Sequence, residues 1–217
     1  MMAGGSDQKQ FIAMYQEAFA GPPYYETYTP EEVLEEVLLP HLRDGLVMVI
    51  QDLEKGGKLV GFGCALPFEK SPDDVKEFLE GLHQSGHLPE GFEHHRAWYM
   101  SELGVLNEYR GLGAAYELVL QRMRSLDHLG ADQYFMRTAA VGSNSKHLYI
   151  KIGSQEIDVL QDVSGTEQDI ENHTHSLQRV YLWGNSGTAT RTIERIKEEN
   201  GYIPFLPPDE ELVAPVA

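Results

Sequence analysis

The segment from Tyr109 to Ala115 is the part of the sequence whose residue types and spacing best suit the binding of an anion. It joins an apolar run, residues 97–105, which predicts a buried strand, to residues 114–129, whose apolar side chains recur at helical spacing. The first N–H groups of a helix have no partner within it, and glycines let a ligand approach the backbone closely. Arg110 adds a donor that suits phosphate oxygens. The turn therefore predicts a phosphate site, with a plain tight turn as the alternative.

Two common nucleotide-binding patterns do not fit this turn. The dinucleotide fingerprint needs three glycines in the order G-x-G-x-x-G, and only Gly111 and Gly113 are present. The phosphate loop of nucleoside triphosphatases ends in Gly-Lys followed by Ser or Thr, which is also missing here.

The turn resembles the acyl-CoA loop of the GNAT superfamily of N-acetyltransferases. That loop carries Arg or Gln, two residues, Gly, one residue, and then Gly or Ala, which Arg110, Gly113 and Ala115 match. The family also has a downstream Leu-Tyr-x-Lys-x-Gly segment, matched by residues 148–153. Asn107 stands where a proline is frequent, and Ser154 stands where an aromatic residue is usual. Two patterns in order, separated by a helix and a strand, make the resemblance specific.

The resemblance implies acetyl-CoA as the cofactor and assigns residues to it. Backbone amides of the loop would hold the pyrophosphate beside Arg110, namely those of Gly111, Leu112, Gly113, Ala114 and Ala115. Backbone groups of Leu103 to Val105 would pair with the pantetheine arm as an added strand. Asn144 is an inexact match for a further contact to that arm. Tyr149 would be the catalytic acid for the departing thiolate, because a phenol holds its proton at neutral pH.

A base is also needed, because only a neutral amine attacks a thioester. Glu102 is the best carboxylate, and strand alternation places it on one face with Met100, opposite Ser101 and Leu103, unless a bulge intervenes. Its alternative is an ordinary ion pair. A histidine from residues 83–95 or a water chain could also serve as the base.

We expect no metal in the reaction, because backbone amides can hold the thioester oxygen. His83 and His87 stand four residues apart, a spacing that could present two ligands on one helical face, but the sequence fixes no third ligand.

The acceptor is expected at the loop between the first two helices, which in GNAT proteins commonly helps to form the acceptor pocket. This loop carries Tyr24, Tyr25, Glu26 and Tyr28. A wall of tyrosines and a carboxylate suits an acceptor that bears an ammonium group. The alternative is an aromatic loop packed on the core.

The elements that must position these residues predict an α/β fold of the α+β type. Its mixed, mostly antiparallel central sheet would have about six to seven strands flanked by helices. Helices are expected at residues 8–20, 29–43, 114–129, 144–151 and 190–200, and strands at 46–53, 59–68, 97–105, 133–139, 155–163 and 176–183. Gly61 and Gly63 inside one strand predict a bulge or the close approach of another element.

The expected domain organisation has three parts. Residues 1–7 would be disordered, and residues 8–185 would form the GNAT-like domain, in which residues 69–96 are an insertion that could roof the acceptor site. Residues 186–217 would form a helix and an acidic, proline-rich tail. The tail could pack on the domain, pack on a second copy of the chain in a homodimer, or stay mobile.

Composition limits the partners. The chain of 217 residues carries a net charge of −17, which argues against nucleic acid and favours a cationic partner, or serves solubility alone. Arg110, Arg122, Arg124 and Arg137 are expected around the anionic cofactor. The single cysteine excludes an internal disulfide framework, and we find neither a secretory signal nor an apolar run that could span a bilayer. These features indicate a cytoplasmic protein.

The sequence thus indicates an N-acetyltransferase that acts on a primary amine, either a small molecule or a peptide. Transfer of a longer acyl group is one alternative. A non-catalytic module that binds acyl-CoA on the same fold is another, because a fold alone does not establish activity. Retention of Tyr149 favours the enzyme.

Overall fold

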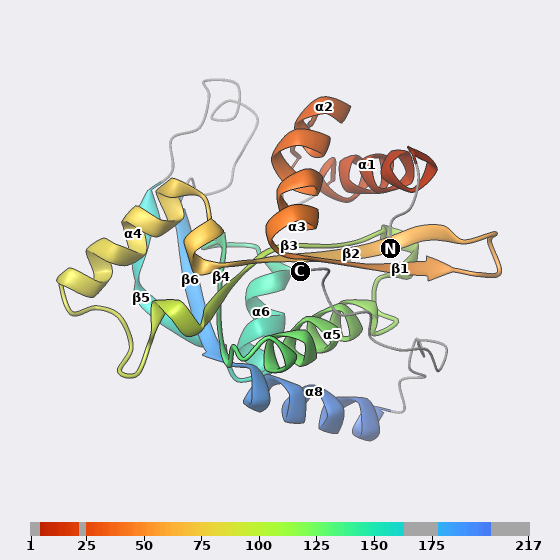
Figure 1. Ribbon diagram of the computed structural model, residues 1–217. Helices are drawn as coiled ribbons and strands as arrows, with labels where there is room; N and C mark the ends of the chain where they lie inside the picture. The colour runs from red at the N-terminus through yellow and green to blue at the C-terminus, as the bar shows by residue number, and fades with distance from the viewer. Residues whose placement is uncertain (1–4, 22–24, 163–177, 201–217) are drawn as a thin grey trace.

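The computed structural model describes residues 5–21, 25–162 and 178–200. Its centre is a six-stranded sheet in the order β1-β2-β3-β4-β6-β5, shown in Figure 1. The strands are β1 (Leu46–Asp52), β2 (Lys58–Pro67), β3 (Ala97–Val105), β4 (Gln133–Ala139), β5 (Gln155–Asp162) and β6 (Gln178–Asn185). All neighbours are antiparallel except β3 and β4. The mixed, mostly antiparallel sheet confirms the predicted fold class.

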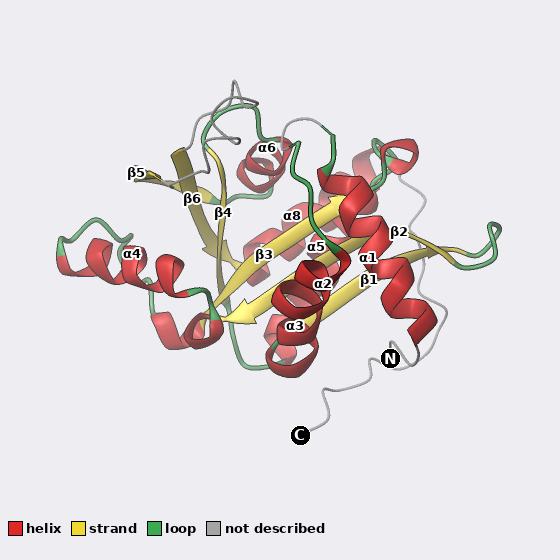
Figure 2. Cartoon of the chain, turned by 90° about the horizontal axis from the view of Figure 1, so that it is seen from above, coloured by secondary structure: helices red, strands yellow, loops and turns green. Residues whose placement is uncertain are grey.

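Strands β3 and β4 stay paired over a short length only. Their parallel register runs from Ala97 opposite Gln133 to Tyr99 opposite Phe135, and Figure 2 shows the strands diverging beyond it. The later part of β3 stays bonded to β2 on its other side, through Val105 opposite Gly61. The edge of β3 that faces β4 is therefore open at the strand's carboxyl end, where its backbone groups can pair with a ligand.

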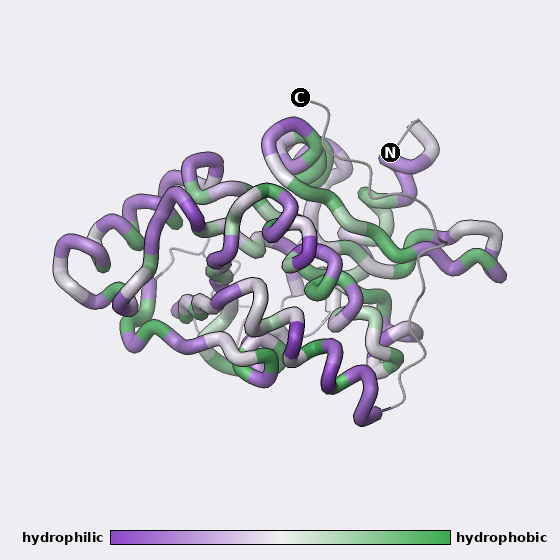
Figure 3. Tube along the Cα trace, turned by 60° about the horizontal axis from the view of Figure 1, so that its bottom comes forward, coloured by the Kyte–Doolittle hydropathy of each residue, from purple (hydrophilic) through white to green (hydrophobic). Residues whose placement is uncertain are grey.

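Helices cover both faces of the sheet. One face carries α1 (Gly5–Phe19), α2 (Pro30–Glu32), the π-helical turn Val33–Leu38, α3 (Leu39–Asp44) and α4 (Asp73–Gln84). The other face carries α5 (Ala114–His128) and α8 (Ser186–Asn200), which pack on each other. Helix α6 (Asn144–Lys151) packs on β4 and β6. The hydropathy colouring of Figure 3 shows the apolar strands enclosed by helices with polar outer turns.

Two glycines of β2 let α5 approach the sheet closely. A Cβ atom on Gly61 would lie 3.3 Å from Cδ1 of Leu118, and one on Gly63 would lie 2.9 Å from Nε of Arg122. Both neighbours belong to α5. The close approach predicted from these glycines is confirmed, and its consequence is that the Arg122 side chain lies flat against the strand.

Residues 69–96 fold over the β4–β6 half of the sheet. Val75, Leu79 and Leu82 of α4 are buried in one cluster with strand residues, and the ring of Phe78 stacks on Tyr181 at 5.0 Å. Helix α4 therefore lies on the same face as α1–α3, on the far side of the divergence between β3 and β4. That the segment roofs an acceptor site stays a prediction.

Several helices and strands begin or end at residues other than those predicted from the sequence. Helix α1 begins at Gly5, so residues 5–7 are helical rather than disordered, and α8 begins at Ser186 rather than at residue 190. Strand β6 runs from Gln178 to Asn185, two residues later than predicted. The loop 163–177, the tail 201–217 and residues 1–4 lie outside the described residues. Within the described part, no helix combines the length and apolar character needed to cross a membrane.

Candidate active site

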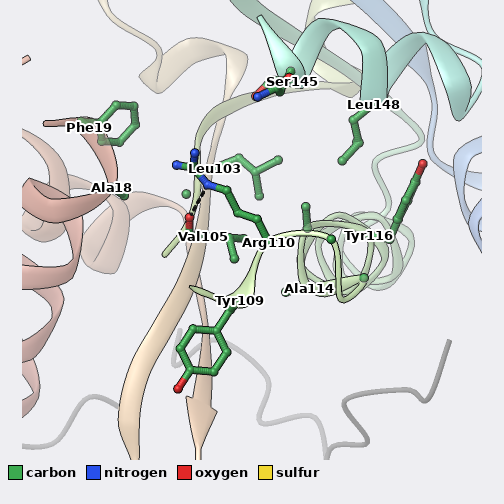
Figure 4. Close-up of a pocket in the computed structure, with 15 residues that line it drawn as sticks. Ala18, Phe19, Leu103, Val105, Tyr109, Arg110, Ala114, Tyr116, Ser145 and Leu148 are labelled. Atoms are coloured by element: carbon green, nitrogen blue, oxygen red, sulfur yellow. Dashed lines mark hydrogen bonds between the residues drawn. The ribbon is translucent and has the colours of Figure 1, made fainter. Parts of the chain in front are cut away.

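A cavity of about 330 Å³ lies where the end of β3, the start of α5 and the start of α6 meet, as Figure 4 shows. Most residues assigned to the cofactor by sequence line it: Leu103, Val105, Arg110, Gly111, Gly113, Ala114, Ala115 and Asn144. Leu112 is absent from the lining, and its side chain is exposed. Ala18 and Phe19 from α1 complete the wall on the opposite side.

The loop before α5 has a backbone that only glycine adopts readily. Gly111 has φ 78°, and Gly113, the residue that precedes the helix, has φ 89° and ψ −4°, both in the left-handed region. No side chain caps the helix at Gly113. The N–H groups of a helix's first turn have no acceptor within the helix. With no capping side chain at Gly113, those of α5 are available to a ligand in the cavity.

Arg110 is tied to the edge of this cavity. Its Nε donates to the carbonyl oxygen of Val105 at 2.9 Å, which draws the side chain from the loop toward β3. This bond uses one of the five guanidinium N–H groups. The remaining donors stay on the cavity side, where they suit phosphate oxygens.

The other arginines do not surround the cavity, so the prediction of a basic cluster around the cofactor is wrong except for Arg110. Arg122 is fully buried against the sheet. Arg124 pairs with Glu194 of α8 at 2.8 Å, and Arg137 pairs with Asp74 of α4. Charge counting from sequence missed these partners because all of them are distant in the chain.

Glu102 projects from β3 toward α1. The hydroxyl of Tyr15 donates to its Oε2 at 3.2 Å. Burial raises the pKa of Glu102 to about 7, the hydrogen bond from Tyr15 opposes that rise, and the charge of Glu26 adds to it. The hydrogen-bond donor that the structure gives this carboxylate is thus a phenol rather than a lysine or arginine. A carboxylate that titrates near neutrality can both accept and release a proton.

A bulge in β3 decides which way Glu102 points. The β2–β3 register steps from Cys64 opposite Glu102 to Leu66 opposite Tyr99, so β3 advances by one residue more than β2. Met100 is consequently buried in the cluster beneath the sheet with α5, while Glu102 faces α1. Glu102 and Met100 therefore lie on opposite faces: the bulge that the sequence analysis named as the exception is present, and its extra residue reverses the alternation.

The loop between α1 and α2 brings a second carboxylate, that of Glu26, near enough to Glu102 to affect its pKa. The hydroxyl of Tyr28 donates to Oε2 of Glu26 at 2.6 Å, and the Tyr28 ring meets that of Tyr15 edge-on at 5.2 Å. Burial raises the pKa of both phenols, and the nearby carboxylates raise it further. Two carboxylates joined by two phenols form a wall that favours a cation.

Tyr25 is the other tyrosine of this loop that the structure describes. The side chain of Tyr25 is half exposed, and its φ of 52° is unusual for a residue other than glycine. Tyr24 lies outside the described residues. Sequence analysis did not assign Tyr15 to the site, because Tyr15 belongs to the apolar stripe of the first helix. Its hydroxyl was the one feature of that residue that indicated a polar role.

Tyr149 is fully buried, and it is not among the residues that line the cavity. Its neighbour Leu148 lines the cavity, whereas the Tyr149 ring packs at 5.9 Å from that of Tyr134. The Tyr149 hydroxyl accepts a hydrogen bond from Arg122 over 3.1 Å. Burial raises the pKa of Tyr149, and the Arg122 guanidinium opposes that rise.

His41 is a further buried polar group that sequence analysis passed over. Its Nδ1 lies 2.5 Å from the carbonyl oxygen of Val37, so Nδ1 carries the proton, and Nε2, 2.6 Å from Oγ of Ser101, accepts from that hydroxyl. Burial lowers the pKa of His41 and keeps the ring neutral. The pair fastens α3 to the bulged part of β3.

The histidines of residues 83–95 belong mainly to the α4 region. His94 stacks on Phe68 at 4.2 Å, and its ring centre lies 5.5 Å from that of His83. Nε2 of His94 is buried without a hydrogen-bond partner. Nowhere in residues 5–21, 25–162 and 178–200 do three or more metal-ligating side chains gather.

Comparisons with known proteins agree with this geometry. A family model described as Acetyltransferase (GNAT) family matches residues 11–153. A search of curated proteins by sequence finds no match.

Solved structures share the fold at low identity. A ribosomal-protein-alanine N-acetyltransferase from Brucella melitensis is 15% identical with a TM-score of 0.57, over 84% of this chain and 96% of that one. An N-acetyltransferase from Staphylococcus aureus Mu50 is 14% identical with a TM-score of 0.58, over 85% and 95%. An acetyltransferase from Salmonella typhimurium, solved with its cofactor acetyl-CoA, is 11% identical with a TM-score of 0.57, over 85% and 91%.

Proposed function

The chain belongs to the acetyltransferase (GNAT) family and is an acyltransferase, and we propose that it transfers an acetyl group from acetyl-CoA to a primary amine. The observation that carries the proposal is the uncapped amino end of α5, which opens through two left-handed glycines into a cavity beside the open edge of β3. That arrangement suits a ligand with a pyrophosphate at one end and an amide-bearing arm at the other.

The chain offers a separate binding group for each part of the cofactor. Backbone amides between Gly111 and Ala115, together with Arg110, would hold the pyrophosphate. Backbone groups of Leu103 and Val105 at the open edge of β3 would pair with the pantetheine amides, and Asn144 also lines the cavity. When bound, acetyl-CoA supplies an activated acyl group as a thioester.

Two side chains would move protons in the reaction. Glu102 takes a proton from the acceptor ammonium so that the neutral amine attacks the thioester carbon. As the new C–N bond formed, the nitrogen would release its second proton to solvent, and as the C–S bond broke, the hydroxyl of Tyr149 would give its proton to the departing sulfur. Glu102 suits its role through a pKa of about 7, and Tyr149 through a hydroxyl whose oxygen accepts from Arg122, so that its own proton is left to donate. Solvent would later remove the proton from Glu102 and return one to Tyr149.

The acceptor we propose is a cationic amine, carried by a small molecule or a peptide. Its ammonium group would meet Glu26 and Glu102, with the rings of Tyr15 and Tyr28 between them. The net charge of −17 would draw such a cation toward the protein. The Brucella neighbour is named for a protein alanine, so an amino terminus is among the acceptors to test first.

The first experiment is a calorimetric titration with acetyl-CoA, followed by an amine screen that detects free thiol. Wild type should bind, and Gly113→Glu and Arg110→Glu should bind at least about 10-fold more weakly, a loss of about 1.4 kcal/mol. Gly130→Glu is the matched control, because Gly130 also has a left-handed backbone, φ 73°, but follows the far end of α5.

The outcomes separate the alternatives. Binding without turnover of any amine would favour the non-catalytic module, and preference for a longer acyl-CoA would replace the acetyl assignment. No binding of any acyl-CoA by a folded wild type would refute the proposed function.

A further inference from the structure

Arg122 is an arginine with no contact to solvent. Its exposed fraction is 0%, and it lies on the sheet-facing side of α5 against Gly63. Nε donates to the carbonyl oxygen of Leu118 at 3.3 Å in the same helix. All the hydrogen-bond partners of this guanidinium in the described part of the chain are uncharged oxygens. Burying a cation without an ion partner is costly, so its presence there calls for a physical reason.

The guanidinium spans the bulge of β3. Nη1 donates to the carbonyl oxygen of Cys64 on β2 at 2.9 Å and to that of Glu102 on β3 at 3.0 Å. These two residues face each other immediately before the register shift. Arg122 therefore satisfies backbone oxygens at the point where the strand turns the proposed base toward α1.

The remaining nitrogen reaches the proposed acid. Nη2 donates to the Tyr149 hydroxyl oxygen at 3.1 Å. Because arginine has no acceptor, this oxygen must accept, and its own proton is left to donate in another direction. A positive charge thus faces the one atom of Tyr149 that becomes negative when the proton leaves.

We propose that Arg122 is a positioning residue for acyl transfer, which aims the Tyr149 proton at the thiolate and stabilises the phenolate that its departure leaves. This inference rests on the proposed function. The step is balanced: the C–S electrons go to sulfur, the O–H proton follows them, and the negative charge passes to the Tyr149 oxygen beside the guanidinium. The phenolate then regains a proton from solvent. One side chain thereby holds the hydroxyl of the acid and the backbone of the base.

The test is a double-mutant cycle on turnover with acetyl-CoA and an accepted amine. We expect Tyr149→Phe to lower kcat about 100-fold, within the usual range for proton transfer. Arg122→Met should lower kcat by a similar factor, and Arg122→Lys, which keeps the charge but lacks the fork, by about 10-fold. KM for acetyl-CoA should stay within about 2-fold, because Arg122 does not line the cavity.

The decisive comparison is made in the Tyr149→Phe background. There Arg122→Lys should cost less than about 2-fold, because the hydroxyl through which it acts is gone. Equal costs in both backgrounds would overturn the inference while leaving the proposed function intact. No loss of activity in Tyr149→Phe would remove the acid assignment and the inference together, and an inactive wild type would refute the proposed function itself.

Folding is monitored separately. Arg124→Met is the matched control, because Arg124 lies two residues further along α5 and makes a surface ion pair with Glu194. It should leave kcat unchanged, because an exposed ion pair contributes little to stability. If Arg122→Met fails to fold, Arg122→Lys carries the cycle. A recovery of kcat from Met to Lys would support the electrostatic role, and identical kcat values for the two would contradict it.

Discussion

The hydroxyl of Tyr15 donates to the carboxylate of Glu102 across the boundary between α1 and β3, at a distance of 3.2 Å. This bond joins the first helix to the strand that carries the proposed base. It also opposes the rise in pKa that burial imposes on Glu102. The amino-terminal helix therefore shapes the chemistry of the site as well as covering the sheet, and this leads to predictions for both residues.

Replacing Glu102 by Gln should lower kcat/KM about 100- to 1000-fold, because an amide of the same shape cannot take the proton. In wild type, kcat/KM should rise with pH up to about 7, as Glu102 ionises, and this limb should be absent from the variant. A pH–rate profile from pH 5 to 9 measures both effects. Ionisation of the amine adds a limb at higher pH, which both proteins should share. A variant that keeps the limb near pH 7 would show that another group is the base.

Replacing Tyr15 by Phe should move that limb to higher pH. The hydrogen bond from Tyr15 favours the ionised carboxylate, so its loss leaves burial and the charge of Glu26 to raise the pKa of Glu102 further. Activity should fall at pH 6 and recover at pH 9. Phe11→Leu serves as the control for repacking, because Phe11 is a buried ring without a hydroxyl that packs beside Tyr15 on the same helix and does not line the cavity. An equal loss at both pH values would indicate misfolding of α1 rather than titration.

Ionisation of Glu102 should also make the free energy of unfolding depend on pH. A rise in pKa from 4.5 in the unfolded chain to about 7 in the folded one corresponds to about 3 kcal/mol. The folded state binds the extra proton, so this stability is fully present below pH 4.5 and is lost as pH rises through 7. Glu102→Gln should remove the loss, so that its free energy of unfolding relative to wild type grows between pH 5 and 8. Urea titrations at each pH would measure this difference, and a constant difference would contradict it.

The sequence predicted the loop before α5 in more detail than it predicted the surroundings of Glu102. Gly111 and Gly113 could be predicted because their backbone conformation restricts residue type, and residue type is what a sequence displays. The direction of Glu102 could not be predicted, because the extra residue of the β3 bulge reverses every face downstream and leaves no compositional mark.

The second limit on prediction from the sequence concerned long side chains with a polar end that stand on otherwise apolar faces of helices. Helical spacing assigns Tyr15 correctly to the interior, and Arg122, which was expected beside the cofactor, is also buried. The roles of both depend on what their terminal atoms reach. Those atoms bond to strand residues that are 87 and 20 positions away in the chain. Such partners are set by the packing of helices on the sheet, which spacing along one helix does not encode.

The loop before α5 should tolerate no side chain at its last position. Gly113→Ala forces a Cβ into the left-handed region at φ 89°, at a cost of about 1–2 kcal/mol. Gly130→Ala, at φ 73°, should cost about the same amount of stability. Only Gly113→Ala should weaken acetyl-CoA binding, by about 10-fold or more, because it alone displaces the amides at the cavity. Equal affinities by calorimetry would show that the cofactor does not use this helix end.

No residue larger than glycine should fit at position 104, because Phe62, which stands opposite Gly104 on the neighbouring strand β2, fills the space beside it. A Cβ atom there would lie 2.4 Å from both Cε1 and Cζ of Phe62 and 3.2 Å from Cβ of Ala18. Phe62 is fully buried and its ring cannot retreat without moving α1, so Gly104→Ala should cost about 1–3 kcal/mol. Gly81→Ala is the matched control: it lies within α4, a Cβ there meets nothing within 4 Å, and the change should stabilise the protein by about 0.5–1 kcal/mol. Urea unfolding of the two variants should therefore shift in opposite directions, and a shift in the same direction would mean that α1 packs less tightly on β2 and β3 than the structure shows.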